Sequence, residues 1–164
     1  MCGIVGAVAE RDVSAILLEG LRRLEYRGYD SAGLVVVDRH DRLQRHRAVG
    51  KVAALADAQA TQPVAGSLGI AHTRWATHGA PTEANAHPHM AENRIAVVHN
   101  GIIENHTELR TELAAAGYPF LSETDTEILP ALIDRELGPD GDLMAALRRA
   151  VAQLKGAYAL AVLD

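Results

Sequence analysis

The amino-acid sequence predicts an α+β fold, with helices layered on sheets. Its 164 residues suit one domain, and a hydrophobic share of 48% is enough to form a core. Segments with strand and helix patterns come in runs and do not alternate strictly along the chain. These three observations favour α+β layers over a doubly wound parallel sheet.

The first sixty residues predict three strands and two helices. Short apolar runs with Val and Ile are typical of buried strands, and they occur at Gly3–Ala9 and Ala32–Val37. Residues 43–49 alternate weakly and are expected to pair with the second run as a hairpin. Asp12 is expected to cap a helix whose apolar residues recur every three or four positions, and the Ala-rich residues 52–60 are weakly helical.

The rest of the chain predicts three more strands and three helices. The expected elements are strands at 67–71, 95–99 and 157–163, and helices that open at the capping pairs Asn105–Glu108 and Thr124–Glu127 and at Leu143. Pro130 stands either at a kink in the second helix or close to a later start. The long irregular stretch 72–93 is expected to carry function. A strand at the last residues suggests that the chain stops inside a larger fold.

Composition excludes several classes of function. A net charge of −5 and a pI near 5.9 leave no basic surface for nucleic acid, and an aromatic content of 4% argues against a binder of single strands. No apolar run approaches the ~18–20 residues of a membrane span, and no basic region precedes the first apolar run as in an export signal. The single cysteine precludes an internal disulfide and favours a cytoplasmic location. Four arginines are expected on a solvated face: Arg39, Arg42, Arg45 and Arg47.

Cys2 is the residue with the clearest chemical potential. Removal of Met1 would leave its α-amine free, and such amines titrate near ~7.7–8, so part of the population is unprotonated at neutral pH. That amine could take the thiol proton directly or through a water, so the residue would carry its own general base. Taken alone, a cysteine near a terminus is more often inert. The glycines at positions 3 and 6 suit close backbone approach around a nucleophile or, equally, an edge strand.

Several ordered motifs identify a family. The start, Met1-Cys2-Gly3-Ile4-Val5-Gly6, resembles that of class II glutamine amidotransferases. Further matching runs are Tyr26–Gly33 (YRGYDSAG), His72–Gly79 (HTRWATHG), Asn85–His89 (NAHPH), His99–His106 (HNGIIENH) and Ser122–Glu127 (SETDTE). Together, and over the whole chain, they resemble the glutaminase half of the glutamine–fructose-6-phosphate aminotransferase family.

The resemblance implies a fold and an activity. The fold would be the four-layer αββα sandwich of N-terminal nucleophile hydrolases, and residues 1–164 would form a glutaminase domain incomplete at its C-terminus. The activity would be hydrolysis of L-glutamine to glutamate and ammonia, without a cofactor. In the family the ammonia passes to a sugar-phosphate isomerase domain, absent from this sequence, which makes glucosamine 6-phosphate from fructose 6-phosphate. The resemblance also implies a homo-oligomer formed through that domain.

The resemblance also implies catalytic roles for three residues. Cys2 would be the nucleophile and, through its α-amine, the base. Asn100 and Gly101 would form the oxyanion hole, whereas an Asn-Gly pair after an apolar strand otherwise indicates a hairpin turn.

Other residues would bind or support the substrate. Arg74 would bind the α-carboxylate of glutamine and Asp125 its ammonium, although the ordinary interpretations are a surface ion pair and a helix-dipole residue. Trp75 would gate the route of ammonia, where core packing is the ordinary interpretation. The remaining candidates are the substrate contacts Thr77, His78 and His87 and the supports Arg27 and Asp30.

Histidines invite a metal hypothesis, because five of them fall between His72 and His99. The sequence has no His-Glu-x-x-His helix and no cysteine pair, and carboxylates are missing beside His87-Pro88-His89. We therefore expect no metal.

Two other functions remain open at this point. An N-terminal cysteine acylase for a larger amide would lack the paired clamp of Arg74 and Asp125. A non-catalytic regulatory module would keep Met1, which displaces the amine from Cys2.

Overall fold

The computed structural model describes residues 2–27, 29–75, 79–137 and 141–164, with the side chain of Arg27 outside this description. The strands are β1 (Gly3–Val8), β2 (Ser31–Val37), β3 (Leu43–Val49), β4 (Leu68–Arg74), β5 (His89–Ala91), β6 (Ile95–Gly101) and β7 (Tyr158–Leu163). The helices are α1 (Ser14–Leu24), α2 (Val52–Thr61), α3 (His106–Ala115), α4 (Ile128–Leu137) and α5 (Leu143–Val151), with short 3-10 helices η1 (Glu25–Arg27) and η2 (Asp125–Glu127). No helix in the described ranges combines the length and the apolar character that crossing a membrane requires.

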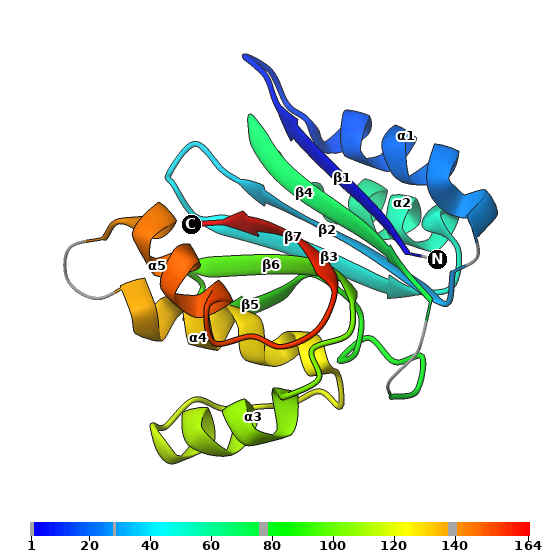
Figure 1. The fold of residues 1–164 in the computed structure, drawn as a ribbon. Coiled ribbons are helices and arrows are strands. Elements are labelled where there is room, and N and C mark those ends of the chain that lie inside the picture. The colour runs from blue at the N-terminus through cyan, green and yellow to red at the C-terminus, as the bar shows by residue number, and fades with distance from the viewer. Residues whose placement is uncertain (1, 28, 76–78, 138–140) are drawn as a thin grey trace.

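These elements form four layers (Figure 1). The first sheet has the order β1-β4-β2-β3 and the second has the order β5-β6-β7, all neighbours being antiparallel. Helices α1 and α2 cover the first sheet, and α4 and α5 cover the second (Figure 1). An apolar cluster lies between the sheets: Val35, Ile70, Ala96, Val98 and Leu163. The predicted αββα order is therefore present.

The alternation of side chains explains the layers. In β2, Leu34 and Val36 pack with α1 and α2, whereas Val35 points between the sheets. Both faces of this strand are buried, which is why its sequence is a continuous apolar run. The same alternation places Ala96 and Val98 of β6 between the sheets. Alternation therefore also selects which polar side chains of these strands meet there.

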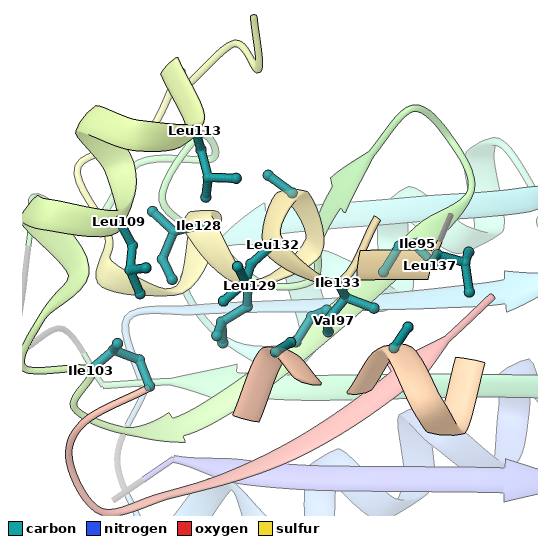
Figure 2. Packing of buried hydrophobic residues seen from close by; sticks show 13 residues of the cluster. Ile95, Val97, Ile103, Leu109, Leu113, Ile128, Leu129, Leu132, Ile133 and Leu137 are labelled. Atoms are coloured by element: carbon teal, nitrogen blue, oxygen red, sulfur yellow. The ribbon is translucent and has the colours of Figure 1, made fainter. Parts of the chain in front are cut away.

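Helix α4 forms the centre of the second core (Figure 2). Its buried residues pack with Ile95 and Val97 of β6 and with Leu109 and Leu113 of α3. Pro130 lies in the first turn of α4, so the later helix start is the correct alternative. In a first turn the missing N–H of proline has no intrahelical partner to lose.

Replacing Leu132 with alanine is expected to lower the free energy of unfolding by ~2–5 kcal/mol. Leu132 is fully buried in this cluster, so the change leaves a cavity that its neighbours fill only in part. Leu121→Ala is the matched control, because that side chain is 86% exposed. Urea denaturation of both variants measures the difference, and equal losses would contradict the assigned core.

The stretch 72–93 contains more regular structure than predicted. Strand β4 runs on to Arg74, and His89–Ala91 forms β5 beside β6. The sequence pattern did not predict the last residues of β4, because their buried face carries a histidine and an arginine instead of apolar residues.

Three local predictions are wrong. Arg45 and Arg47 do not lie on a solvated face: they are partly buried and donate to the carbonyl oxygens of Pro88, Ala84 and Ala86. Asn105 does not cap α3 through its side chain, which instead bonds the backbone of Gln153 and Lys155. Thr124 does not cap its helix through its side chain either, because its hydroxyl contacts Nε2 of His89 at 3.0 Å. In all three cases a partner distant in sequence replaced the local interaction.

Candidate active site

The candidate nucleophile lies where β1 begins and β4 ends. Gly3 pairs with Thr73, and its backbone N–H donates to the Thr73 hydroxyl at 3.1 Å. This register brings Cys2 next to Trp75, whose backbone N–H donates to the Cys2 sulfur at 3.2 Å. The thiol is partly exposed. The sulfur thus lies at one end of the first sheet, within reach of solvent.

Asn100 reaches this point from the second sheet. Its Nδ2 donates to the carbonyl oxygen of Cys2 at 3.2 Å, and its Oδ1 lies 2.8 Å from Nε2 of His72. The Asn100 side chain therefore links β6 of the second sheet to Cys2, which precedes β1, and to His72 of β4 in the first sheet. An amide donor stands beside the residue that carries the sulfur.

The Asn100-Gly101 pair does not form a hairpin turn, since both residues belong to β6 and face Ala159 and Tyr158 of β7. Gly101 has φ of +128°, and a Cβ there would lie 2.3 Å from the carbonyl oxygen of Ala157. Only glycine fits this backbone and this contact.

Arg74 is the last residue of β4 and is only 4% exposed. Its guanidinium pairs with the carboxylate of Asp30 at 3.5 Å and donates to the carbonyl oxygens of Gly79 and Ala80 at 3.4 Å each. The surface interpretation of this arginine is thus wrong. A planar guanidinium can donate paired hydrogen bonds to an anion such as a carboxylate.

Asp125 lies in η2 and is 5% exposed. Its Oδ2 accepts from the backbone N–H of Ile103 at 2.8 Å, and the Thr126 hydroxyl donates to its Oδ1 at 3.4 Å. The carboxylate therefore ties the segment after β6 to η2, and it keeps acceptor capacity for a cation.

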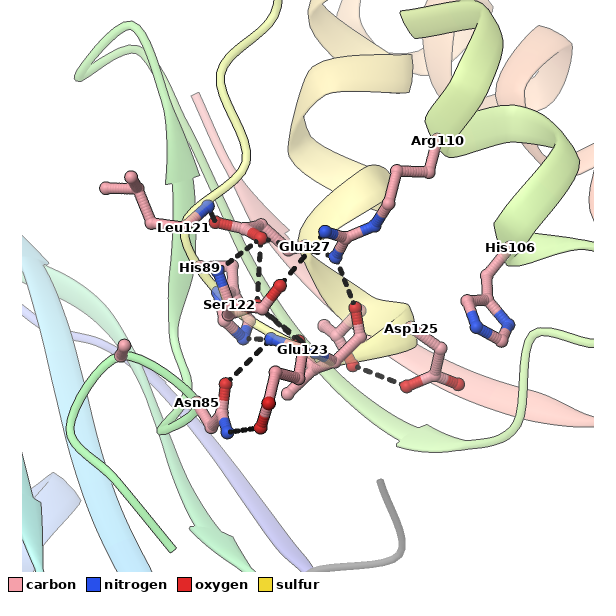
Figure 3. Close-up of polar contacts among 12 residues, drawn as sticks. Asn85, His89, His106, Arg110, Leu121, Ser122, Glu123, Asp125 and Glu127 are labelled. Carbon is pink, nitrogen blue, oxygen red and sulfur yellow. Dashed lines mark hydrogen bonds and ion pairs between the residues drawn. The ribbon is translucent and has the colours of Figure 1, made fainter. Parts of the chain in front are cut away.

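A latch not foreseen from the sequence joins the segment after Arg74 to the segment before Asp125 (Figure 3). The Glu123 carboxylate accepts from Asn85 Nδ2 at 3.2 Å and from the Ala80 backbone N–H at 3.3 Å. Asn85 also accepts from the Glu123 backbone N–H at 2.9 Å and donates to the Ala80 carbonyl at 2.9 Å. Both residues lie in the family motifs, but nothing in their local sequence predicts that they meet.

Four buried histidines lie behind Asn100: His72, His87, His89 and His99. The ring of His87 stacks on that of His72 at 4.2 Å and meets the edge of His89 at 5.0 Å. Burial lowers the pKa of all four imidazoles, that of His72 to about 4. In the described part of the chain, no group of histidine, cysteine and carboxylate side chains is arranged to hold a metal.

The other predicted site residues do not form one group with Cys2 and Asn100. Trp75 follows Arg74 and is 53% exposed. His87 belongs to the buried histidine stack, one ring away from the His72–Asn100 contact. Thr77, His78 and the side chain of Arg27 lie outside the described residues. The structure thus brings together Cys2, Asn100 and the Arg74–Trp75 segment, with Asp125 anchored to the chain that follows β6.

Comparison with known proteins gives one family. A family model described as a glutamine amidotransferase domain matches residues 72–164. Over its full length the chain is 64% identical to the isomerizing glutamine–fructose-6-phosphate aminotransferase of Pseudomonas putida and 62% identical to that of Escherichia coli K12. It spans 27% of the length of each of these relatives.

Solved structures share the architecture. The glutamine phosphoribosylpyrophosphate amidotransferase of B. subtilis, complexed with ADP and GMP, superimposes with a TM-score of 0.78 at 30% identity, covering 99% of this chain and 34% of that one. A class II glutamine aminotransferase domain protein of Silicibacter pomeroyi has the same fold, with a TM-score of 0.60 at 23% identity, covering 82% of this chain and 65% of that one. These matches confirm the predicted fold class.

Proposed function

Because the chain belongs to the glutamine amidotransferase domain family, we propose that it hydrolyses L-glutamine to glutamate and ammonia with Cys2 as the nucleophile. The observation that carries this proposal is the meeting of the Cys2 sulfur, the Asn100 amide and the buried Arg74 segment at one end of the first sheet. A thiol, an oxyanion donor and a cationic clamp are what cleavage of an amino acid's side-chain amide requires.

The reaction would begin on the mature N-terminus. With Met1 removed, the α-amine of Cys2 takes the thiol proton, and the Trp75 N–H donates a hydrogen bond to the sulfur at 3.2 Å. The thiolate attacks the carboxamide carbon of glutamine, and the carbonyl oxygen becomes an oxyanion. Nδ2 of Asn100 and the backbone N–H of Gly101 are the donors proposed for that oxygen.

The intermediate would then collapse in two steps. The C–N bond breaks as the ammonium of Cys2 returns its proton to the leaving nitrogen, which departs as ammonia. A γ-glutamyl thioester remains on the sulfur. Water, deprotonated by the same amine, attacks this thioester, and the C–S bond breaks to release glutamate and the thiol.

Substrate recognition would use both buried charges. The Arg74 guanidinium is proposed to bind the α-carboxylate while its Nη1 stays paired with Asp30 at 3.5 Å. Asp125 is proposed to bind the α-ammonium, and Trp75, Thr77 and His78 to close over the ligand. Arg27 is proposed as a support for the Cys2 strand. A larger apolar amide would offer neither of these two buried charges a group of opposite charge, so this arrangement favours glutamine over the substrates of a general acylase.

The relatives indicate where the ammonia goes. Their names describe transfer to fructose 6-phosphate, and the chain spans 27% of their length. We infer that residues 1–164 supply ammonia to a sugar-phosphate isomerase domain that makes glucosamine 6-phosphate, in a cytoplasmic homo-oligomer formed through that domain. Comparison of glutamine hydrolysis with fructose 6-phosphate amination in the full-length protein would test this assignment.

A diazoketone analogue of glutamine should label the chain once, at Cys2. Intact-mass and peptide analysis would detect one adduct, which Cys2→Ala abolishes. Arg74→Ala is expected to slow labelling by about tenfold or more through loss of the carboxylate contact, since a charge-assisted hydrogen bond contributes ~1.5–3 kcal/mol. Arg39→Ala is the matched control, because that side chain is exposed. Labelling that survives Cys2→Ala, or faster labelling by lactam or lipid amides, would reject the proposal.

Glu123→Ala is expected to raise KM for glutamine by about tenfold, with a smaller effect on kcat. The variant opens the latch that holds Ala80, whose carbonyl oxygen contacts Arg74. Steady-state assays of ammonia release measure both constants. Glu108→Ala, which removes an exposed carboxylate on α3, is the matched control. Equal KM values for the two variants would show that the latch does not shape the substrate site.

A further inference from the structure

The side-chain amide of Asn100 has two nearly isosteric orientations with opposite chemistry. In one, the NH₂ group faces Cys2 and can donate to an oxyanion. In the other, the amide oxygen faces Cys2 and would repel the same oxyanion. The oxyanion hole therefore depends on a contact that distinguishes the two ends of this amide.

We propose that His72 is the positioning residue that fixes the Asn100 amide with its NH₂ group toward Cys2. The inference rests on the function proposed above. It starts from two contacts of Asn100, one on each end of its amide: Nδ2 to the Cys2 carbonyl at 3.2 Å and Oδ1 to His72 Nε2 at 2.8 Å.

The chemistry of these partners sets the direction of both hydrogen bonds. The Cys2 carbonyl can only accept, so the amide atom that faces it must be the NH₂ nitrogen. The other end is then the amide oxygen, which also can only accept. Nε2 of His72 must therefore carry a proton and donate it to Oδ1 of Asn100.

His72 is suited to this single role. Its ring is fully buried, and burial lowers its pKa to about 4, so it is neutral near pH 7 and has one proton to place. Its Nδ1 is buried and makes no hydrogen bond in the described part of the chain, although the backbone of His99 also acts on the ring. The hydrogen bond to Asn100 therefore favours the proton on Nε2. The one proton lies on Nε2, and the tautomer and the amide orientation are coupled.

The ring of His72 is held on several sides. Its backbone lies in β4, paired with Ile4 of β1 and Gly33 of β2. His87 stacks on its face at 4.2 Å with an interplanar angle of 23°. Gly33 makes room for this stack, because a Cβ there would lie 2.1 Å from the His87 carbonyl oxygen.

The stacked rings of His72 and His87 also contact β6, the strand that carries Asn100. Nδ1 of His87 accepts from the backbone N–H of His99 at 3.4 Å. His72 and His87 thus brace both the side chain of Asn100 and the backbone directly before it. His87 therefore supports the proposed oxyanion donor indirectly, through His72 and through the backbone of His99.

The test uses the full chain and compares His72→Phe, which keeps a planar ring without a donor, with His72→Gln, which keeps an N–H donor. Loss of an oxyanion donor lowers kcat by ~10²–10³. We expect His72→Phe to lower kcat by ~10–100-fold with KM for glutamine changed less than about threefold, and His72→Gln to recover much of the loss. His89→Gln, whose imidazole contacts Thr124 and not Asn100, is the matched buried control and should keep kcat within about threefold.

Asn100→Ala separates positioning from general structure. If His72 acts through the amide, adding His72→Phe to Asn100→Ala causes no further loss of kcat. An equal loss in both backgrounds, or an unchanged kcat in His72→Phe alone, would overturn the inference.

The tautomer of His72 gives a second readout that does not depend on turnover. ¹⁵N NMR of the wild-type chain should show His72 as the neutral Nε2–H tautomer between pH 5 and 8. An Nδ1–H tautomer would overturn the inference even if the variants fail to fold. Absence of glutamine hydrolysis in the wild type would instead refute the proposed function, and the NMR spectrum would still decide the orientation of the His72–Asn100 contact.

Discussion

A chain that retains Met1 is expected to hydrolyse glutamine ~10²–10⁴-fold more slowly than the processed chain, which is the usual contribution of a general acid–base group. Retention turns the α-amine of Cys2 into an amide, which can neither take the thiol proton nor return it to ammonia. Cys2→Ala gives the background rate of glutamine hydrolysis, because it removes the nucleophile as well. Expression with a methionine aminopeptidase inhibitor, followed by intact-mass analysis, would provide both forms for assays of ammonia release.

Two observations would show whether the lost amine is responsible. The unprocessed chain should still react with iodoacetamide at Cys2, since the thiol remains partly exposed. Its urea unfolding should match that of the processed chain. Equal turnover by the two forms would contradict the proposed base and would favour one supplied by another residue.

Acid is expected to destabilise the fold strongly between about pH 6.5 and pH 4. Histidines in an unfolded chain titrate near ~6.5, whereas burial lowers the pKa of His72 in the folded chain to about 4 and those of His87, His89 and His99 in the same direction. Within this window the unfolded chain binds more protons than the folded chain, so the free energy of unfolding falls as the pH falls. Above about pH 6.5 the full stability is present.

The expected loss of unfolding free energy on acidification is large compared with the total stability of a domain. The change at His72 alone corresponds to roughly 3 kcal/mol between the two limits, against a typical total of ~5–15 kcal/mol. Urea unfolding at pH 7.5, 6 and 5 would measure the slope. Asp38, whose pKa is lowered to about 2 by hydrogen bonds from His40 and Arg42 that outweigh its desolvation, loses its stabilising effect only below about pH 4 and does not overlap this window.

Matched variants assign the slope to the buried rings. His89→Phe removes one buried imidazole and should reduce the proton uptake on unfolding by about one between pH 6 and 5. His40→Gln, which changes an exposed histidine, is the matched control. An unfolding free energy that stays constant from pH 7.5 to 5 would contradict the buried, neutral state of the four histidines.

The secondary structure was largely predictable because most elements bury one apolar face. Apolar runs predicted β1, β2, β6 and β7, and three-to-four spacing predicted α1, to within a few residues. The other helices were predicted from alanine content and from candidate capping and end residues. Prediction failed where polar residues are buried. The end of β4 carries a histidine and an arginine, and β5 is only three residues long and begins with a histidine, so no periodicity of apolar residues marks either segment.

The site could be predicted only as far as motifs and chemistry allow. Chemistry made Cys2 a candidate nucleophile, since the thiol and its candidate base belong to one residue, and the family resemblance raised this candidate above the inert interpretation. The roles of Asn100, Arg74 and Asp125 came from the family resemblance, because their local patterns favour a turn, an ion pair and a helix-dipole residue. Neither the Glu123–Asn85 latch nor the His72–Asn100 contact has a local signature.

The sequence by itself determined the class of fold, the family and the candidate nucleophile, a single cysteine with no disulfide partner in the chain. Only the tertiary structure decided which polar groups face one another. Side-chain alternation in β4 and β6 directs His72 and Asn100 into the space between the sheets, and the packing of the two sheets brings them to 2.8 Å. Periodicity specifies the face on which each side chain lies, whereas the partner across the gap depends on contacts between residues 28 positions apart in the chain.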